Sequence, residues 1–457
     1  MQIKDYKNIY FIGIGGIGMS AIARYFNSIG KNVFGYDRMA TQLTAELTAE
    51  GIGITFQEDV DQIPAHYQSK YDTLVVYTPA IPANHPQLIY FQQQQFEIMK
   101  RSQVLGLLSD NLNGIGIAGT HGKTTVSTIT AHIFKTSALD CNAFLGGISR
   151  NYQSNLLLSK TSPWMILEAD EFDRSFLQLH PQLAVITSMD ADHLDIYGDK
   201  NELEKSFQAF VYQIKEGGIL VYKKGLVLTH DKLSAYTYSL DEKADFYAEN
   251  IKLVEGFYQF DLVYPDGIIK DLLFSYPGKI NVENAIAASA MALLCGVEAD
   301  ELRKALSTFK GVRRRFDYQI RNEKIVFIDD YAHHPKELWE SISSVRELYP
   351  EKKITGIFQP HLYSRTRDFA EGFAASLNLL DEVILLDIYP ARELPIEGVN
   401  SEIILKNLKV PAKLCTKGDL IELLREKEFE VLLTLGAGDI DKLVEPIKNL
   451  ICERLEC

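Results

Sequence analysis

The sequence is poor in cysteine and has no long apolar run. Its 457 residues include 5 cysteines, a scattered and odd-numbered set without a CxxC pair. This usage predicts reduced thiols in a cytosolic protein rather than a disulfide framework. No stretch approaches the roughly 18 apolar residues of a membrane span, and the opening residues MQIKDYKNIYFIG lack the apolar core of a secretion signal. We therefore expect neither a disulfide-stapled secreted module nor a membrane protein.

Positive charge is also in deficit. The chain has 47 Lys and Arg against 61 Asp and Glu, a net charge of −14, so its long-range field repels polyanions and general nucleic-acid binding is not expected. Small anionic ligands are compatible with this charge, because local backbone N–H groups, Lys and Arg capture a phosphate. The length, with 46% hydrophobic and 24% charged residues, indicates about three ordinary globular domains.

Three strand–glycine–helix patterns divide the chain. The first begins with the apolar residues 9–11, the second leads from Gly114 into GTHGKTT, and the third follows the plausible hinge GVRRRF at residues 311–316. This alternation predicts three consecutive α/β domains with parallel sheets, over residues 1–108, 109–312 and 313–457. Residues 235–276, rich in Tyr and Phe in alternating positions, are expected to form an antiparallel excursion.

A glycine-rich segment follows the first predicted strand and opens a helix. Glycines at these positions let the backbone approach a diphosphate at the helix N-terminus. Asp37 ends the next strand, where an acid commonly meets a ribose hydroxyl. On these residues alone, the pattern favours a dinucleotide such as NAD on a Rossmann-like domain. The predicted ligand-binding residues are Gly13, Gly15, Gly16, Gly18 and Asp37.

The segment GTHGKTT predicts a second phosphate loop, in a P-loop ATPase-like central domain. Its backbone would hold phosphates, Lys123 would reach the terminal ones and Thr124 would suit Mg²⁺. The loop is a variant, because Ile117 stands where a P-loop has its first glycine. We expect Lys123 to be a solvent-facing charge whose removal spares the fold. The predicted ATP-binding residues here are Gly119, Thr120, His121, Gly122, Lys123, Thr124 and Thr125.

Polar clusters follow two other predicted strands of the central domain. EADE, residues 168–171, follows WMIL, and DADH, residues 190–193, follows LAVIT. Parallel strands place such clusters at one sheet edge, and carboxylates with an imidazole there suit Mg²⁺ bound to nucleotide phosphates. In the predicted Rossmann-like C-terminal domain, the segment DDYAHHP and the later pair His361 and Arg365 also follow strands.

Seven motifs occur in the order found in Mur ligases: GTHGKTT, EADE, the ADH of DADHLDIYG, PGxxNxxNA, FxGVxRRF, DYAHHP and LGAGD. The chain resembles this family over essentially its whole length. The resemblance implies that the ligand of the N-terminal domain is a UDP-sugar rather than NAD. The N-terminal glycines would hold the diphosphate of this UDP-sugar. The segments GIGGIGMSAIA, FQPHLYSRT and LLDIYPARELPIEGV resemble the branch that adds the first amino acid.

The resemblance implies ATP- and Mg²⁺-dependent ligation of L-alanine to UDP-N-acetylmuramate through an acyl phosphate, in peptidoglycan precursor synthesis. By motif, Mg²⁺ would be held by Thr124, Glu168 and His193, and ATP would also contact Asn281, Asn284, Arg315 and Asp330. The muramoyl or alanine end would face His361 and Arg365, with Tyr331 and His333 beside them. The residues expected to act in catalysis are Lys123, His193, Glu168, His361 and Arg365. We expect a cytoplasmic monomer or homodimer.

Three positions depart from the family pattern: Ile280 replaces a usual His, Leu362 a usual Arg, and Gln208 the lysine that several relatives carbamylate. Three alternatives stay open at this point. They are a recycling ligase that attaches an intact peptide to the same UDP-sugar, a nucleotide-regulated binding protein, and an NAD-dependent enzyme.

Overall fold

The computed structural model describes residues 5–110, 112–190, 194–391 and 393–455. The chain forms two compact units. The first runs to Lys252 and includes Gln259–Ser275 and Glu283–Lys310. The second contains Leu253–Tyr258, Tyr276–Val282 and the chain from Gly311 onwards.

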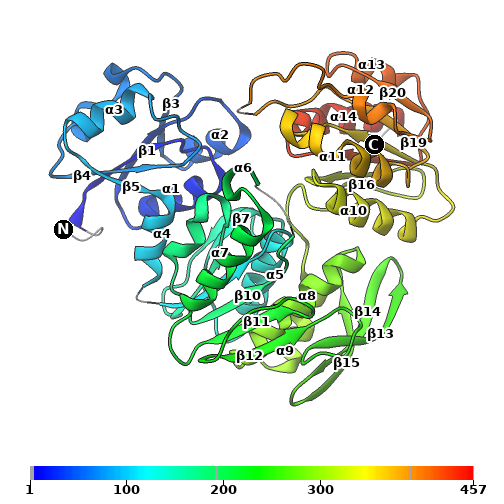
Figure 1. Ribbon diagram of the computed structural model, residues 1–457, viewed down its shortest axis with the longest axis horizontal. Coiled ribbons are helices and arrows are strands. Elements are labelled where there is room, and N and C mark those ends of the chain that lie inside the picture. Colours follow the sequence, from blue (N-terminus) through cyan, green and yellow to red (C-terminus); the bar gives the residue numbers. More distant parts are fainter. Residues whose placement is uncertain (1–4, 111, 191–193, 392, 456–457) are drawn as a thin grey trace. The chain divides into compact units, whose positions relative to one another are not determined.

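The first unit begins with a five-stranded parallel sheet in the order β3-β2-β1-β4-β5 (Figure 1). Its central strand β1 is entirely buried, as expected for a strand covered on both faces. The elements are β1 (Asn8–Ile12), α1 (Ile17–Ser28), β2 (Asn32–Tyr36), α2 (Gln42–Ala49), β3 (Gly53–Thr55), β4 (Thr73–Tyr77), α3 (Pro86–Gln93), β5 (Glu97–Lys100) and α4 (Arg101–Ser109). The predicted β-loop-α-β start is confirmed.

A seven-stranded sheet follows, in the order β12-β11-β10-β6-β9-β7-β8. Its pairs are parallel except β7 with β8, which are antiparallel. The elements are β6 (Asn113–Ala118), α5 (Lys123–Thr136), β7 (Asn142–Ser149), β8 (Ser154–Leu157), β9 (Trp164–Glu168), β10 (Leu183–Ile186), α6 (Leu194–Tyr197), α7 (Lys200–Tyr212), β11 (Ile219–Lys223) and β12 (Ser234–Tyr238). Because β6 lies between β9 and β10, the residues directly after β9 and β10 leave the sheet on either side of the phosphate loop.

The predicted antiparallel excursion over residues 235–276 is wrong in its first part. Strand β12 is a parallel edge strand that pairs with β11. The excursion itself is a separate three-stranded sheet of β13 (Tyr247–Val254), β14 (Phe257–Tyr264) and β15 (Gly267–Phe274), joined by two-residue turns. Helices α8 (Lys279–Leu294) and α9 (Ala299–Thr308) follow it.

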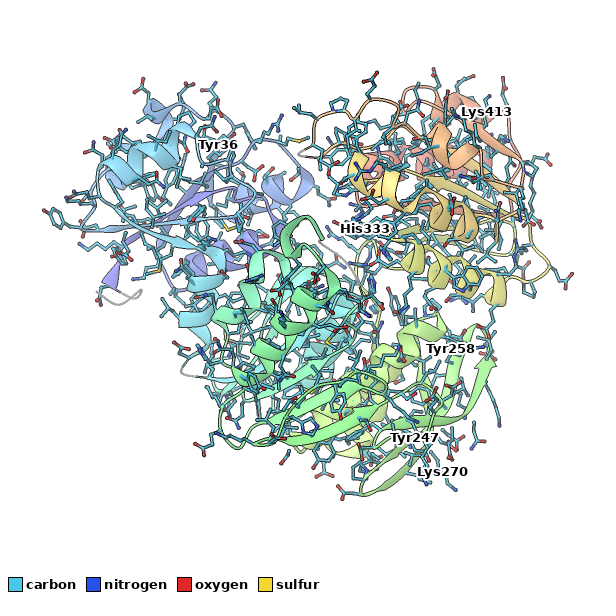
Figure 2. The ribbon with its side chains drawn as sticks, in the orientation of Figure 1. Tyr36, Tyr247, Tyr258, Lys270, His333 and Lys413 are labelled. Carbon is cyan, nitrogen blue, oxygen red and sulfur yellow. The ribbon has the colours of Figure 1, made fainter. Side chains whose placement is uncertain are left out.

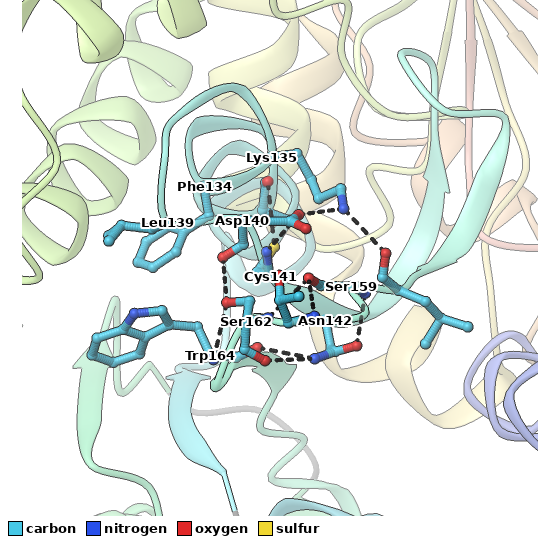
Figure 3. A network of polar contacts seen from close by, with 12 residues as sticks. Phe134, Lys135, Leu139, Asp140, Cys141, Asn142, Ser159, Ser162 and Trp164 are labelled. Atoms are coloured by element: carbon cyan, nitrogen blue, oxygen red, sulfur yellow. Dashed lines mark hydrogen bonds and ion pairs between the residues drawn. The ribbon is translucent and has the colours of Figure 1, made fainter.

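The turn from α5 into β7 is fixed by a polar network (Figure 3). Asp140 has a left-handed φ of 50° and forms an ion pair with Lys135. Its side chain accepts the Cys141 N–H at 2.8 Å, and its carbonyl accepts the Ser162 hydroxyl at 2.8 Å. These contacts anchor the C-terminal end of the helix that begins at Lys123. Burial raises the pKa of the Cys141 thiol, so this cysteine is an inert core residue.

The first two sheets are joined inside the first unit by a buried hydrogen-bond network. Arg24 on α1 is 8% exposed, and its Nη1 donates to Asn155 Oδ1 on β8 at 2.5 Å. Asn155 in turn donates to the Ile17 carbonyl at 2.6 Å and to the Ser20 hydroxyl at 2.9 Å. Asn155 therefore holds the first turn of α1, the helix that the glycine loop opens.

The second unit contains a six-stranded sheet in the order β16-β17-β21-β18-β19-β20. Only β16, which the sequence analysis missed, is antiparallel to its neighbour. The elements are β16 (Asp317–Arg321), β17 (Val326–Asp330), α10 (Pro335–Leu348), β18 (Ile354–Phe358), α11 (Tyr363–Leu377), β19 (Glu382–Leu385), α12 (Glu402–Leu405), β20 (Ala412–Leu414), α13 (Leu420–Arg425), β21 (Val431–Leu435) and α14 (Val444–Leu455). The predicted strand–helix alternation is confirmed.

None of the helices in the described part of the chain combines the length and the apolar composition needed to cross a membrane. The described cysteines, Cys141, Cys295, Cys415 and Cys452, are free thiols.

Candidate active site

The N-terminal glycine loop is shaped by contacts that exclude side chains. Gly13 has a φ of 89°, and a Cβ there would lie 2.6 Å from Thr78 Cγ2. The N–H groups of Gly13 and Ile14 both donate to the Tyr36 carbonyl, at 2.8 and 3.0 Å. Helix α1 then begins at Ile17 with Gly16 as its N-cap. The loop thus presents a helix N-terminus, the geometry predicted for a diphosphate site.

Asp37 lies against this loop, as predicted, but its carboxylate accepts hydrogen bonds from the backbone. Its Oδ2 accepts the Gly15 N–H at 2.7 Å, and its Oδ1 accepts the Met39 N–H at 3.2 Å. A Cβ on Gly15 would lie 2.8 Å from the same Oδ2. Asp37 therefore fixes the middle of the glycine loop, and its predicted contact with a ribose stays a prediction.

Replacing Asp37 with Ala is expected to weaken the binding of UDP-N-acetylmuramate about tenfold, since losing one charge-assisted hydrogen bond costs about 1.5 kcal/mol or more. ADP affinity should be nearly unchanged, because the phosphate loop belongs to the other sheet. Gly15→Val should act in the same direction. Titration calorimetry with both ligands measures this, with Asp61→Ala, at an exposed position, as the matched control. Equal UDP-sugar affinity in Asp37→Ala and Asp61→Ala would contradict the assignment.

Arg101, the first residue of α4, is a residue that sequence reasoning missed. A Cβ on Gly18 would lie 2.5 Å from Arg101 Nη1, so the guanidinium covers the end of the glycine loop. Its Nη2 also donates to Asp170 Oδ2 of the EADE segment at 3.1 Å. The one signal in the sequence is an arginine directly after a strand.

The second phosphate loop contacts the two residues that follow strand β10. Gly119 has a φ of 138°, and a Cβ there would lie 2.0 Å from Thr187 Oγ1. Ser188 Oγ accepts the His121 N–H at 2.8 Å and lies 3.0 Å from Thr120 Oγ1. Thr187 and Ser188 directly follow β10 and were not predicted as site residues. Their hydroxyls shape the loop from β10.

The expectation that Lys123 is a solvent-facing charge is wrong. Its side chain is 14% exposed, and its Nζ lies 2.9 and 2.8 Å from the two carboxylate oxygens of the fully buried Glu171. Nζ also donates to the Gly119 carbonyl at 2.7 Å. Burial works to lower the pKa of Lys123, but the carboxylates of Glu171, Asp170 and Glu168 outweigh it and hold the pKa above its usual value. Lys123 is therefore charged and part of a buried ion pair.

Thr124 and Glu168 lie together as predicted for a magnesium site. Thr124 Oγ1 donates to Glu168 Oε1 at 3.2 Å. A Cβ on Gly146 would lie 2.1 Å from Glu168 Oε2, so only glycine leaves room for this carboxylate. His193, the third predicted ligand, lies outside the described residues, and among the residues described no three His, Cys, Asp or Glu side chains form a metal-binding group.

Of the other residues predicted to contact ATP, the structure places Asn284 beside the phosphate loop, and Gly122 and Thr125 belong to the loop and the first turn of α5. Gly122, with a φ of 81°, is the N-cap of α5, and a Cβ there would lie 2.8 Å from Asn284 Oδ1. Asn284 is thus adjacent to the loop, in line with its predicted ATP contact. Thr125 is buried in the first turn of α5. Asn281 belongs to the other compact unit, where its side chain donates to the Pro277 carbonyl at 2.6 Å.

A cavity of about 220 Å³ in the first unit reaches from the glycine loop to the EADE segment. Its lining includes Gly16 and Gly18 of the glycine loop at one side and Glu168 and Asp170 of the EADE segment at the other, with Arg101 between them. A ligand bound at the first loop can therefore extend to the metal-binding carboxylate predicted beside the second.

Several predicted residues of the second unit contact one another in a row, through one cation–π contact and two ring–ring contacts. The Arg315 guanidinium lies 4.8 Å from the centre of the Tyr331 ring. Tyr331 contacts His333, which lies just before α10 (Figure 2), and His333 contacts His361, with ring centres 5.2 and 5.8 Å apart. Arg365 is buried in the first turn of α11. The structure thus brings these predicted groups to one sheet edge.

Asp330 is buried and its carboxylate holds the start of this site. Its Oδ2 accepts the Ser341 hydroxyl at 2.8 Å and its Oδ1 accepts the Ala332 N–H at 3.0 Å. Burial raises the pKa of Asp330, although Ser341 and Arg315 act to lower it. Its predicted contact with ATP stays a prediction.

Two of the departures from the family pattern have clear local roles. Gln208 donates to the Thr229 carbonyl and accepts the Thr229 N–H, both at 2.8 Å, so its amide fixes a loop. Leu362 has a φ of 69°, a conformation that is strained for a leucine, and its N–H donates to the Tyr389 carbonyl at 2.9 Å. Nothing described explains Ile280.

Three family descriptions match successive parts of the chain. The Mur ligase family catalytic domain matches residues 8–112, the Mur ligase middle domain matches residues 117–292, and the Mur ligase glutamate ligase domain matches residues 314–438. The chain is 52% identical to the UDP-N-acetylmuramate–L-alanine ligase of Parabacteroides distasonis, covering 100% of this chain and 99% of that protein. It is 47% identical to the ligase of the same name from Flavobacterium johnsoniae, covering 100% of both.

Solved structures agree in fold. The UDP-N-acetylmuramate–alanine ligase of Thermotoga maritima superposes with a TM-score of 0.83 at 28% identity, over 98% of this chain and 99% of that one. A murein peptide ligase from Psychrobacter arcticus superposes with a TM-score of 0.69 at 21% identity, over 97% and 98% of the two chains. The three α/β domains, the ordered motifs and relatives that align over the whole length lead to one conclusion: the chain belongs to the Mur ligase family.

Proposed function

We propose that this protein uses ATP to join L-alanine to the lactyl carboxylate of UDP-N-acetylmuramate, an early step of peptidoglycan precursor synthesis in the cytoplasm. The observation that carries the proposal is the cavity that reaches from the glycine loop to Glu168, the carboxylate beside Thr124 of the second phosphate loop. A binding protein or a dehydrogenase needs one such loop, whereas a ligase must bring an acceptor carboxylate to a terminal phosphate. The relatives with half of their residues identical carry this activity in their names.

The first step transfers the γ-phosphate of ATP to the lactyl carboxylate, giving an acyl phosphate and ADP. The glycine loop would bind the UDP diphosphate, and the muramoyl end would extend through the cavity towards Glu168. Two anions must meet in this step, so their repulsion has to be neutralised. The ammonium of Lys123, held charged beside Gly119, would do this at the phosphate. The amine of L-alanine then displaces phosphate through a tetrahedral intermediate.

Magnesium fits the residues present. Thr124 Oγ1 and Glu168 Oε1 are oxygen ligands of the kind that Mg²⁺ prefers, 3.2 Å apart beside the phosphate loop, and His193 is the further predicted ligand. Bound there, the ion would supply charge neutralisation at the nucleotide phosphates.

The three sheets suggest a division of labour. Residues 1–108 would bind the UDP-sugar and residues 109–312 would bind ATP. Residues 313–457 would supply Arg315 and Asp330 towards ATP, and His361, Arg365, Tyr331 and His333 towards the muramoyl or alanine end. The third domain would have to close over the nucleotide for these groups to act. We expect a monomer or a homodimer.

Phosphate release from ATP tests the proposed reaction. It should require both UDP-N-acetylmuramate and L-alanine, and UDP-N-acetylglucosamine, which lacks the lactyl carboxylate, should not replace the sugar substrate. Faster turnover with the intact tripeptide than with L-alanine would identify a recycling ligase instead. Nucleotide binding without any turnover would identify a nucleotide-regulated binding protein, and tight NAD binding without UDP-sugar binding would identify a dehydrogenase.

A further inference from the structure

Two hydrogen bonds and a close ion-pair contact tie the phosphate-loop lysine, Lys123, to oxygens of the protein itself. A lysine ammonium has three N–H donors. In the structure its nitrogen contacts three oxygens, the Gly119 carbonyl at 2.7 Å and the two Glu171 oxygens at 2.9 and 2.8 Å. An incoming phosphate oxygen has to compete with these oxygens for the Lys123 ammonium. The Gly119 carbonyl is part of the loop itself, so Glu171 is the partner that must yield.

The main chain of Glu171 is held in place by hydrogen bonds. Its own carbonyl accepts the Arg174 N–H at 2.9 Å and the hydroxyl of the buried Tyr197. Its side chain is 0% exposed, so the carboxylate is removed from bulk solvent. Burial raises the pKa of Glu171, while the Lys123 ammonium beside it acts to lower it. The carboxylate that pairs with Lys123 is therefore an anionic competitor next to the position where the nucleotide's terminal phosphates would bind.

We propose that Glu171 is a positioning residue that competes with the terminal phosphate of the nucleotide for Lys123, and so weakens nucleotide binding and speeds product release. The proposal rests on the ATP site described above. An intramolecular competitor lowers the apparent affinity of a ligand by the fraction of time it occupies the shared partner. The same contact keeps Lys123 charged and pointed along the loop. Glu171 thus lowers the affinity for the nucleotide, orients Lys123 and allows faster turnover.

Glu171→Gln tests this competition. Glutamine has the same size and still offers Lys123 one carbonyl oxygen, but it removes the negative charge. ADP, titrated by calorimetry with and without Mg²⁺, should bind about tenfold more tightly, an ordinary size for coupling between two interactions. Turnover should fall while a pre-steady-state burst of phosphate appears, because ADP release becomes slower. A role confined to structure would instead weaken ADP binding and produce no burst.

The matched control is Asp173→Asn. Asp173 lies two residues away in the same segment, its side chain is 37% exposed, and its ion-pair partner is Lys100 at 2.8 Å rather than Lys123. Its φ of 53° is a conformation that asparagine adopts readily. The variant removes the same charge from the same loop, and ADP affinity should change less than twofold.

Glu171→Asp covers the case in which the glutamine variant does not fold. It keeps the charge but withdraws the carboxylate from Lys123 by one methylene group, so ADP should again bind more tightly than to the wild type. Equal or weaker ADP binding in a folded Glu171 variant would overturn the inference. Failure of wild-type protein to bind ADP at all would overturn the proposed function instead, so the two outcomes are distinguishable.

Discussion

Lys123→Met is expected to lower the ligase rate at least a hundredfold, on the scale of about 10²–10³ for losing one preorganised electrostatic contact to a transition state. The variant should also be less stable. Glu171 is fully buried, and removing one member of a buried ion pair costs about 3–5 kcal/mol. Alanine-dependent phosphate release and urea unfolding of the same preparation measure the two effects.

A second substitution separates the two effects. In Lys123→Met combined with Glu171→Leu, an apolar pair replaces the ion pair, an exchange that is often neutral for stability. The free energy of unfolding should return towards the wild-type value while the activity stays lost. A folded Lys123→Met protein with normal turnover would refute the assignment of this loop to ATP.

Glu168→Gln is expected to raise the Mg²⁺ concentration needed for half-maximal activity by about 10–100-fold, the order of loss seen when support of a metal site is removed. The amide keeps the size of the side chain but removes the anionic oxygens beside Thr124. The measurement is a Mg²⁺ titration of UDP-N-acetylmuramate- and alanine-dependent turnover at saturating ATP.

Gly146→Ala reaches the same carboxylate without changing it. The added Cβ would lie 2.1 Å from Glu168 Oε2, so the carboxylate must move. We expect the same direction of change in the Mg²⁺ titration. Glu202→Gln, which removes a carboxylate from the first turn of α7, is the control and should titrate like the wild type. An unchanged Mg²⁺ requirement in Glu168→Gln would remove this residue from the predicted metal site.

The arrangement of the phosphate loops could be predicted because parallel sheets bring the carboxyl ends of neighbouring strands together. The residues after β6, β9 and β10 were expected at one edge, and the structure orders these strands side by side. The same reasoning predicted the cluster of Tyr331, His333 and His361. The spacing of apolar residues and the positions of the glycines are local features of the sequence. The prediction therefore required no knowledge of contacts between distant residues.

What could not be predicted depends on partners distant in the sequence. Strand β12 alternates like a hairpin strand, yet its parallel pairing with β11 is set by the sheet edge available to it. The burial of Lys123 depends on Glu171, 48 residues later, and nothing in the P-loop pattern indicates it. Asp37 was expected to face a ligand, but its carboxylate accepts the N–H of Gly15, which lies 22 positions earlier.

The buried contact between Arg24 and Asn155 limits how this enzyme can exchange parts with its relatives. The two residues are 131 positions apart in one unit, with Arg24 on helix α1 and Asn155 on strand β8 of the second sheet. A recombination point between the first and second sheets would combine one parent's α1 with the other parent's β7–β8 hairpin. Such a chimera would bury a guanidinium against a side chain selected for another partner. Viable crossovers should therefore carry both residues from the same parent, so that the UDP-sugar and ATP sites are inherited together.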